Sequence, residues 1–391
     1  MTTQARVRLG CERLFDDDNV ALVRDRRVGL VTNHSGVDGE LVATADRLHN
    51  TPGVELVLLF GPEHGIRGDA EDGVTVTSGT DARTGVDTIS LYGAQRQPCA
   101  DELAQIDVLL FDIQDVGVRF YTYVYTMSLS MVACAQAGVP FVVLDRPNPL
   151  GGMDVAGNIL DPAFASFVGL YPIPVQYGLS LGELARLLNS EFDIGVELHV
   201  IDMLGWQRRM RWQDTGIPWV APSPNMPTPS TTDVYPGMCF FEGTNVSEGR
   251  GTTCPFEQVG APFIDGFRLA DHLNQLQLRG VLFRPVFFRP AFGKHEGEVC
   301  RGVQLHVTEA PDFCPLRTGF SALAATRHLW PDDFEWRTNA SGIHNFDKLA
   351  GTDSTRHAID AGVVVEDLLA EWADERRGFE ETRQKYLNYP L

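Results

Sequence analysis

A turn that follows an apolar run carries three side chains able to do chemistry. The sequence LLFGPEHGIRG (58–68) places Glu63, His64 and Arg67 among glycines and a proline that fix the shape of a loop. A carboxyl partly buried at the end of a strand can acquire the raised pKa that general acid or base catalysis needs at neutral pH. Glu63 is therefore the first candidate catalytic residue, although it could also be a solvated loop glutamate paired with Arg67. His64 could orient Glu63, bind a ligand or pair with a carboxylate.

A second cluster lies in FDIQDVGVRFYTYVYT (111–126), where a strand is expected to end and a helix to begin. Asp115 could cap that helix while the tyrosines pack inward. This interpretation does not account for Gln114, Arg119 and several phenols together. Amides, carboxylates and aromatic faces suit a sugar, whose hydroxyls need hydrogen bonds and whose C–H faces stack on rings. Gln114, Arg119 and Tyr123 are therefore candidate substrate-binding residues.

A third cluster lies in the segments SPNMPT (223–228) and FEGTNVSEGRGT (241–252). Here charged and amide side chains stand among small residues, in loops whose backbone is permissive. The segments could be a structural hinge between two domains or part of a binding site. The candidate site residues are Asn225, Glu242, Asn245, Glu248 and Arg250.

The charge of the chain limits what it can bind. The formal net charge is -20, and a field of that sign repels phosphate backbones, so we expect no nucleic-acid partner. An anionic small ligand would need a local arginine pocket, because arginine holds a carboxylate through two parallel hydrogen bonds. The candidates for such a clamp are Arg67, Arg119 and Arg250.

Several common catalytic motifs are missing from the sequence. It contains no G-x-G-x-x-G after the first expected strand, no P-loop, no G-x-S-x-G elbow and no H-E-x-x-H. The seven cysteines include no C-x-x-C pair and are interpreted as buried free thiols of a reducing compartment. We therefore expect no cofactor and no metal ion.

The first half of the chain alternates between apolar runs and helical patterns. Near-continuous apolar runs, typical of strands buried on both faces, occupy 27–33, 54–60, 106–113, 139–146 and 196–203. Helical patterns lie between them at 120–138 and 179–192. This order predicts an α/β fold with a parallel sheet, whose strands end along one edge where ligands bind. Asn33 follows the first strand and is a candidate binding residue for that reason.

The amino-acid composition of the sequence changes after residue 205. Residues 218–263 are rich in Pro, Gly, Ser and Thr, and their scattered aromatics indicate a long, ordered, irregular segment. Beyond it, 281–310 is predicted to form strands, and 319–330 and 361–387 helices. We expect a first domain over 1–225 and an α+β second domain over 226–391.

The N-terminus has no apolar core typical of a signal peptide, and no apolar run approaches the about 20 residues that cross a bilayer. We therefore expect a cytoplasmic chain without membrane insertion.

The motifs together resemble one known family. The segments LVTNHSGVDG, LFGPEHGIRGDA, FDIQDVGVRFYTYVYTM, VLDRPNPLGG, PSPNMPT, VYPGMCFFEGTNVSEGRGTTCPFEQVGAPF and KYLNYPL are similar to those of NamZ-type exo-β-N-acetylmuramidases, in order from about residue 10 to the C-terminus. The resemblance implies a Rossmann-like N-terminal domain with a parallel sheet, a C-terminal α+β auxiliary domain and an active site in the cleft between them. It also implies release of terminal N-acetylmuramic acid from the non-reducing end of peptidoglycan fragments, in cell-wall turnover or salvage, with Glu63 as the catalytic glutamate.

The implied substrate is a small molecule, a muropeptide sugar or N-acetylmuramic acid linked to N-acetylglucosamine. An arginine at its lactyl carboxylate would distinguish it from N-acetylglucosamine. Glycoside hydrolysis usually uses two carboxyls, and the second could be Asp115 or Glu242. In a substrate-assisted reaction, either residue would instead orient the 2-acetamido group. The oligomeric state stays open.

Two other functions remain open at this point. The chain could be another amino-sugar hydrolase, an N-acetylglucosaminidase or a deacetylase, or it could be a protein that binds muropeptides without catalysis.

Overall fold

The central feature of the fold is a seven-stranded sheet with strand order β3-β4-β2-β1-β5-β6-β9. The computed structural model describes residues 6–63, 65–68 and 79–391. Every neighbouring pair in the sheet is parallel except β3 and β4. The strand bounds are β1 (Arg26–Thr32), β2 (Val54–Gly61), β3 (Gly79–Thr80), β4 (Asp87–Ser90), β5 (Val108–Asp112), β6 (Phe141–Leu144) and β9 (Leu198–Ile201).

The five predicted strands correspond to β1, β2, β5, β6 and β9, so the predicted parallel sheet is confirmed. All residues of β5 and β6 are buried, which explains why their sequences are continuously apolar. The two predicted helices correspond to α4 (Tyr123–Ala137) and α5 (Leu181–Glu191). The shorter helices of this part are α1 (Gly10–Arg13), α2 (Thr44–His49) and α3 (Ala100–Leu103), with 3-10 turns η1 (Val20–Leu22), η2 (Pro162–Phe164) and η3 (Trp212–Asp214).

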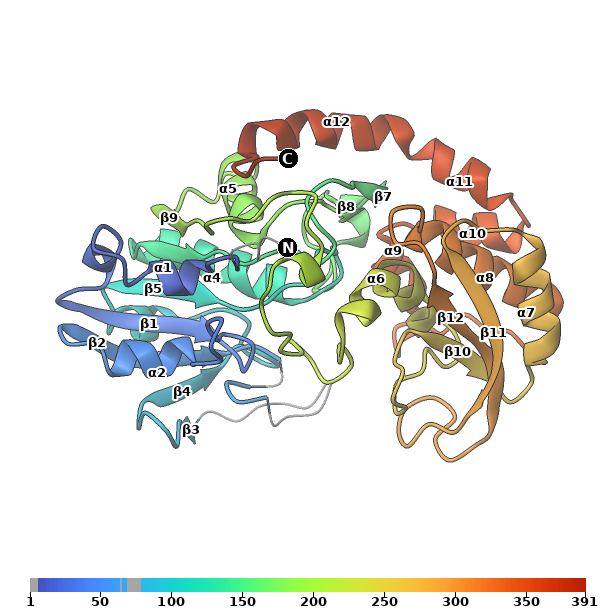
Figure 1. Ribbon diagram of the computed structural model, residues 1–391, viewed down its shortest axis with the longest axis horizontal. Coiled ribbons are helices and arrows are strands. Elements are labelled where there is room, and N and C mark those ends of the chain that lie inside the picture. The colour runs from blue at the N-terminus through green and yellow to red at the C-terminus, as the bar shows by residue number, and fades with distance from the viewer. Residues whose placement is uncertain (1–5, 64, 69–78) are drawn as a thin grey trace, which may run out of the picture.

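The second half forms a separate α+β layer around the antiparallel sheet β10-β12-β11, to the right in Figure 1. Helix α7 contacts β11 and β12, and α8 packs against α6 and α7. The bounds are α6 (Pro229–Met238), η4 (Cys239–Gly243), β10 (Gln258–Ala261), α7 (Gly266–Gln275), β11 (Val281–Phe288), β12 (Cys300–Val307), α8 (Pro315–Leu329), α9 (Asn345–Ala350), α10 (Ser354–Asp360), α11 (Val365–Glu371) and α12 (Ala373–Arg383).

The segment 218–263 is ordered, as expected, but it is less irregular than its composition indicated, because it contains α6 and β10. The side chain of Thr228 accepts a hydrogen bond from the Thr231 backbone, and Pro229 occupies the first helical position. Both residues favour the start of a helix. The proline that indicated a loop therefore marks a helix N-terminus.

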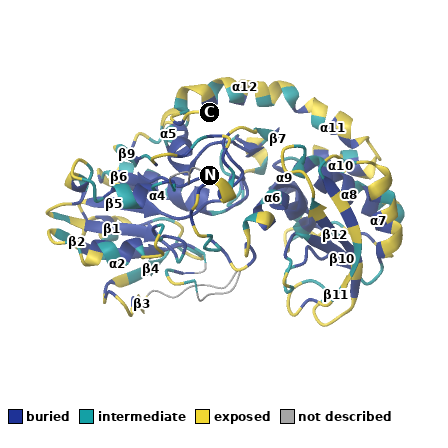
Figure 2. Ribbon diagram, in the orientation of Figure 1, coloured by how far each residue is buried: buried dark blue, intermediate teal, exposed yellow. Residues whose placement is uncertain are grey.

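One apolar core extends from the large sheet into the second half. Phe111 of β5 and Phe320 of α8 belong to the same buried cluster, and Phe120 stacks edge-on against Phe240 with ring centroids 5.5 Å apart. Figure 2 shows the buried residues continuing from the strands into α6, α8 and β12. The short hairpin β7 (Ala156–Ile159) and β8 (Pro174–Gln176) lies next to this junction. The two halves are therefore held together by a shared core as well as by the chain.

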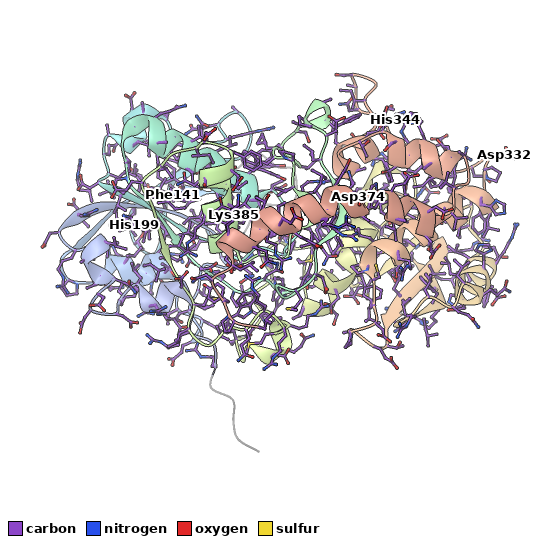
Figure 3. All side chains as sticks on the ribbon, turned by 90° about the horizontal axis from the view of Figure 1, so that it is seen from above. Phe141, His199, Asp332, His344, Asp374 and Lys385 are labelled. Atoms are coloured by element: carbon purple, nitrogen blue, oxygen red, sulfur yellow. The ribbon has the colours of Figure 1, made fainter. Side chains whose placement is uncertain are left out.

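The C-terminal end of the chain returns to the first half. Helix α12 runs from the second half over to the first, as the positions of Asp374 and Lys385 show in Figure 3. After η5 (Gln384–Tyr386), the Tyr389 hydroxyl donates to Asp145 at 2.5 Å. Among the described residues, no helix has the length and apolar character to span a bilayer.

Candidate active site

Glu63 lies in the loop that follows β2, at the edge where the parallel strands end. Gly65 closes this turn with a left-handed φ of 74°, and its N–H donates to the Pro62 carbonyl at 3.0 Å. The hydroxyl of Thr122, which precedes α4, donates to Glu63 Oε2 at 3.4 Å. The half-buried Glu63 lines a cavity of about 380 Å³. The loop geometry thus holds the candidate acid at a cavity wall.

Aromatic rings form much of the wall of this cavity, which we call the aromatic cavity. Tyr121 and Tyr123 meet edge to face, with centroids 5.0 Å apart. Asn33 supports one of them, since its Nδ2 donates to the Tyr123 hydroxyl at 3.0 Å. The Tyr123 hydroxyl in turn donates to the Pro222 carbonyl at 2.7 Å. The aromatic lining residues are Tyr92, Phe120, Tyr121, Tyr123, Phe167, Tyr235 and Phe256.

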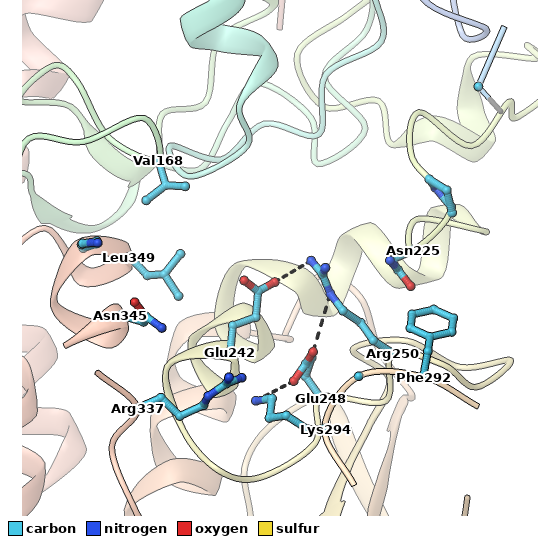
Figure 4. Close-up of a pocket in the computed structure, with 14 residues that line it drawn as sticks. Val168, Asn225, Glu242, Glu248, Arg250, Phe292, Lys294, Arg337, Asn345 and Leu349 are labelled. Carbon is cyan, nitrogen blue, oxygen red and sulfur yellow. Dashed lines mark hydrogen bonds and ion pairs between the residues drawn. The ribbon is translucent and has the colours of Figure 1, made fainter. Parts of the chain in front are cut away.

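A second cavity of about 660 Å³ adjoins the aromatic cavity, and we call it the charged cavity. Figure 4 shows its walls, with Glu242, Arg250 and Lys294 reaching into it from the second half. The two cavities are neighbours, because five residues line both of them. These residues are Val168, Asn225, Glu242, Arg250 and Leu349.

A chain of ion pairs crosses the charged cavity. Arg250 lies 2.8 Å from Glu242 and 3.6 Å from Glu248, and Lys294 lies 2.7 Å from Glu248. Burial raises the pKa of Glu242, although Arg250 beside it acts in the opposite direction. Burial also acts to raise the pKa of Glu248, but Lys294 and Arg250 outweigh it and lower that pKa. Glu242 is therefore the carboxyl of the pair better able to carry a proton.

Lys294 also fixes the end of η4, which carries Glu242, and the loop that follows it. Its Nζ donates to the carbonyls of Phe241 at 2.7 Å, Thr244 at 2.9 Å and Val246 at 2.6 Å. Burial lowers the pKa of Lys294, against the opposing charge of Glu248. A buried ammonium with several acceptors holds a loop rigidly. Sequence reasoning missed this lysine, whose signal was its position between glycines in FGKHEGE.

Two family models together match nearly the whole chain. The model described as "Exo-beta-N-acetylmuramidase NamZ, N-terminal" matches residues 28–230, and the corresponding C-terminal model matches residues 233–389. The chain belongs to the NamZ family. A similar protein from Bacillus subtilis (strain 168), named peptidoglycan beta-N-acetylmuramidase NamZ, is 48% identical over 384 residues, covering 98% of this chain and 92% of that protein.

Two solved structures from Bacteroides fragilis NCTC 9343, both described as DUF1343 family proteins, share the fold of this NamZ-family chain. One has a TM-score of 0.90 with 37% identity and covers 98% of this chain and 99% of its own. The other has a TM-score of 0.79 with 30% identity and covers 99% of each chain. The predicted Rossmann-like, mixed α/β architecture is thus confirmed.

Two of the three candidate clamp arginines lie elsewhere in this NamZ-family fold. The fully buried Arg119 donates to the carbonyls of Asn158, Ile173, Leu349 and Ala350 at 2.7–3.2 Å and lines neither cavity. A guanidinium engaged with four backbone carbonyls joins segments of the protein to one another.

Arg67 is engaged in the same way, but with carboxylates. Its guanidinium binds Asp81 at 2.8 Å and Asp46 at 3.0 Å, outside both cavities. Of the three candidate clamps, only Arg250 faces the cavities.

Asp115 and Gln114 are buried behind the cavity walls. The Asp115 carboxyl accepts hydrogen bonds from the Tyr177 hydroxyl and, at 2.7 Å, from the Gly117 N–H. Burial raises the pKa of Asp115 to about 6, against these hydrogen bonds. Gln114 donates to the carbonyls of Asp115 and Pro147, each at 2.8 Å. Both residues therefore brace the loop after β5, and neither lines the two cavities.

The remaining candidate site residues also divide into those that line a cavity and those that do not. Asn225 and Glu248 line the charged cavity. Asn245 bonds outward, because its Nδ2 donates to the Asp333 carbonyl at 2.8 Å and its Oδ1 accepts the Glu335 N–H at 3.0 Å. His64 lies outside the described residues.

Several residues that line the cavities lie in no recognisable sequence motif. They come from loops and helices between positions 92 and 349 that no local pattern connects. Over the part of the chain that the structure describes, no three His, Cys, Asp or Glu side chains are grouped so as to hold a metal ion. The missed residues include Tyr92, Phe167, Phe292, Lys294, Arg337, Asn345 and Lys348.

Proposed function

We propose that this chain is an exo-β-N-acetylmuramidase that hydrolyses the bond of a terminal N-acetylmuramic acid at the non-reducing end of peptidoglycan fragments. Membership of the NamZ family and the Bacillus subtilis relative support this activity. The proposed location of the active site rests on one observation. Glu63 and Glu242 line the same aromatic cavity, at the edge where the strands of the parallel sheet end.

In this proposal, Glu63 is the general acid that protonates the leaving oxygen. Glu242 is the second carboxyl, because it faces the same cavity while Asp115 does not. Three roles suit Glu242: it could activate an attacking water, attack as the nucleophile itself, or orient the 2-acetamido group as an internal nucleophile. Its raised pKa favours the last of these roles, because a more basic carboxylate is a better acceptor for the acetamide N–H while the acetamide oxygen attacks the sugar carbon and the glycosidic bond breaks.

The aromatic rings would stack on the sugar, and Arg250 would meet polar groups at the junction of the two cavities.

The two family models meet between residues 230 and 233. We propose a domain division there, close to the expected boundary at 226, with the C-terminal end of the chain returning to the first domain. The N-acetylmuramic acid released by the reaction would serve cell-wall turnover or salvage.

The test is chromophore release from a 4-nitrophenyl β-glycoside of N-acetylmuramic acid, measured beside the N-acetylglucosamine analogue. Cleavage of the first glycoside in strong preference to the second is expected. Cleavage of the second alone would place the chain among other amino-sugar hydrolases. Binding of the first glycoside without turnover would instead favour a non-catalytic muropeptide-binding protein.

A further inference from the structure

The charges that line the charged cavity do not balance. Glu242 and Glu248 are each bound to a cation, Arg250 and Lys294 respectively. Two more cations, Arg337 and Lys348, line the same cavity. Across the residues that the structure describes, neither side chain has a hydrogen bond or an ion pair, and no dashed line reaches Arg337 in Figure 4. The cavity therefore has an excess of positive charge within a chain whose formal net charge is -20.

Backbone geometry brings the two cations to one wall. The Asn345 N–H donates to the Arg337 carbonyl at 2.9 Å, which fixes Arg337 beside the start of α9. Lys348 lies three residues after Asn345, so both side chains share one face of that helix. Asn345 lines the cavity as well. This cationic wall (Arg337, Asn345 and Lys348) thus presents two positive charges and an amide to the same space.

The cationic wall lies close to the proposed reaction centre. Leu349, the neighbour of Lys348, lines both cavities, as does Glu242. A lone exposed cation on a protein surface is usually just solvated and contributes little. Two cations without a counter-charge, in a cavity that adjoins the proposed site, indicate instead that an anion is supplied by the ligand.

We propose that Arg337 and Lys348 determine specificity by binding the carboxylate of the substrate's lactyl ether. This inference rests on the proposed function, which supplies a sugar with that carboxylate. The sugar ring would occupy the aromatic cavity, and the lactyl group would extend past Leu349 into the charged cavity. N-acetylglucosamine lacks the carboxylate and would leave the cationic wall without a partner.

The experiment compares two 4-nitrophenyl glycosides of N-acetylmuramic acid, one with the free lactyl acid and one with its neutral primary amide. In the Arg337→Gln and Lys348→Gln variants, kcat/KM for the acid should fall about ten- to a hundredfold, mainly through KM. The acid-to-amide ratio should approach one in the double variant. Arg337→Lys and Lys348→Arg, which keep the charge, should retain most of the ratio.

A matched control is Arg377→Gln, because Arg377 is an exposed cation of α12 that lines neither cavity. It should leave both substrates unaffected. An unchanged acid-to-amide ratio in the double variant would overturn the inference while the proposed function stands. If the wild-type protein cleaves neither glycoside, the proposed function itself fails.

A third substrate distinguishes the source of the carboxylate. A glycoside whose lactyl group carries a dipeptide has its free carboxylate further from the ring. If the Arg337 and Lys348 variants lose activity on this substrate alone, the cationic wall binds a peptide carboxylate and the lactyl assignment is wrong. A loss confined to the free lactyl acid supports it.

Discussion

At the scale of single residues, access to the cavity separates the candidate catalytic carboxyls. Glu63 and Glu242 both line the aromatic cavity. Asp115 has a raised pKa, yet it is buried against Tyr177 and Gly117 and reaches no cavity wall. A perturbed pKa is therefore insufficient to identify a catalytic residue, because structural carboxyls are perturbed by the same burial.

The first prediction concerns Glu63. Replacing it in Glu63→Gln should reduce kcat on the N-acetylmuramic acid glycoside by about 10²- to 10⁴-fold, because the amide cannot donate the proton. The amide can still accept the hydrogen bond from Thr122, so the thermal unfolding midpoint should stay nearly unchanged. Glu55→Gln is the matched control, since Glu55 is exposed near the start of the same strand. A folded and fully active Glu63→Gln enzyme would contradict the assignment.

The second prediction concerns Asp115 and pH. Its pKa is raised from 3.8 to about 6 in the folded protein, so between these values the folded state keeps a proton that the unfolded state has lost. The contribution of Asp115 to wild-type stability should therefore fall as pH rises through this window, by on the order of 2–3 kcal/mol. Asp115→Asn lacks this proton, so its stability relative to wild type should increase between pH 4 and 7, measured by urea unfolding.

Asp107→Asn supplies the control for this pH dependence. Arg27 lowers the pKa of Asp107 to about 2, so both states are deprotonated above about pH 5 and the difference from wild type should be constant there. A parallel pH profile for Asp115→Asn and wild type would show that burial of Asp115 does not shift its protonation.

At the scale of elements, α9 is held in place by a residue from the other half. Two carbonyls at its C-terminal end, those of Leu349 and Ala350, accept hydrogen bonds from Arg119 at 3.2 and 2.7 Å. A cation at this end also complements the helix dipole. Because α9 contributes Asn345, Lys348 and Leu349 to the cavities, Arg119 affects the site by positioning this helix.

The third prediction follows from this arrangement. Arg119→Met should destabilise the protein by about 3–5 kcal/mol, since it leaves four carbonyls without their charged donor. The thermal midpoint reports the loss. Arg119→Lys should restore part of the stability and should keep the preference for the lactyl acid over its amide. If Arg119→Lys loses that preference without losing stability, Arg119 is a substrate clamp after all.

At the scale of the whole molecule, the last residues of the chain complete the first half. The Met203 N–H donates to the Tyr389 hydroxyl at 2.9 Å, and the Arg208 N–H donates to the Pro390 carbonyl at 2.9 Å. Tyr389 also stacks edge-on against Trp206, with centroids 5.0 Å apart. The chain end thus ties the second half to the first across the outside of the molecule (Figure 1).

The fourth prediction tests this tie. Deleting residues 388–391 should lower the stability by about 2–4 kcal/mol, because it removes these hydrogen bonds and leaves the buried Asp145 without the Tyr389 donor. Deleting Leu391 alone is the control, since that residue is 72% exposed. Equal thermal midpoints for the two deletions would show that the chain end does not stabilise the fold.

Local pattern was enough to predict the sheet and one wall of the candidate site. The central strands β5 and β6 are buried on both faces, so their sequences are continuously apolar, and parallel connections place the strand ends at one edge. Glu63 was recognisable because it follows such a strand in a loop with fixed shape. Arg119 stands in an equally suggestive segment, but a sequence does not specify which acceptors surround a guanidinium, and here they are backbone carbonyls.

The family and the α/β architecture were thus determined by the sequence alone, through motifs and periodicities that each lie within a few consecutive residues. The composition of the charged cavity was decided only by the tertiary structure. Lys294, Arg337 and Lys348 meet Glu242 through contacts between segments separated by dozens of residues. Charge and burial depend on which segments meet in space, and no local periodicity records that.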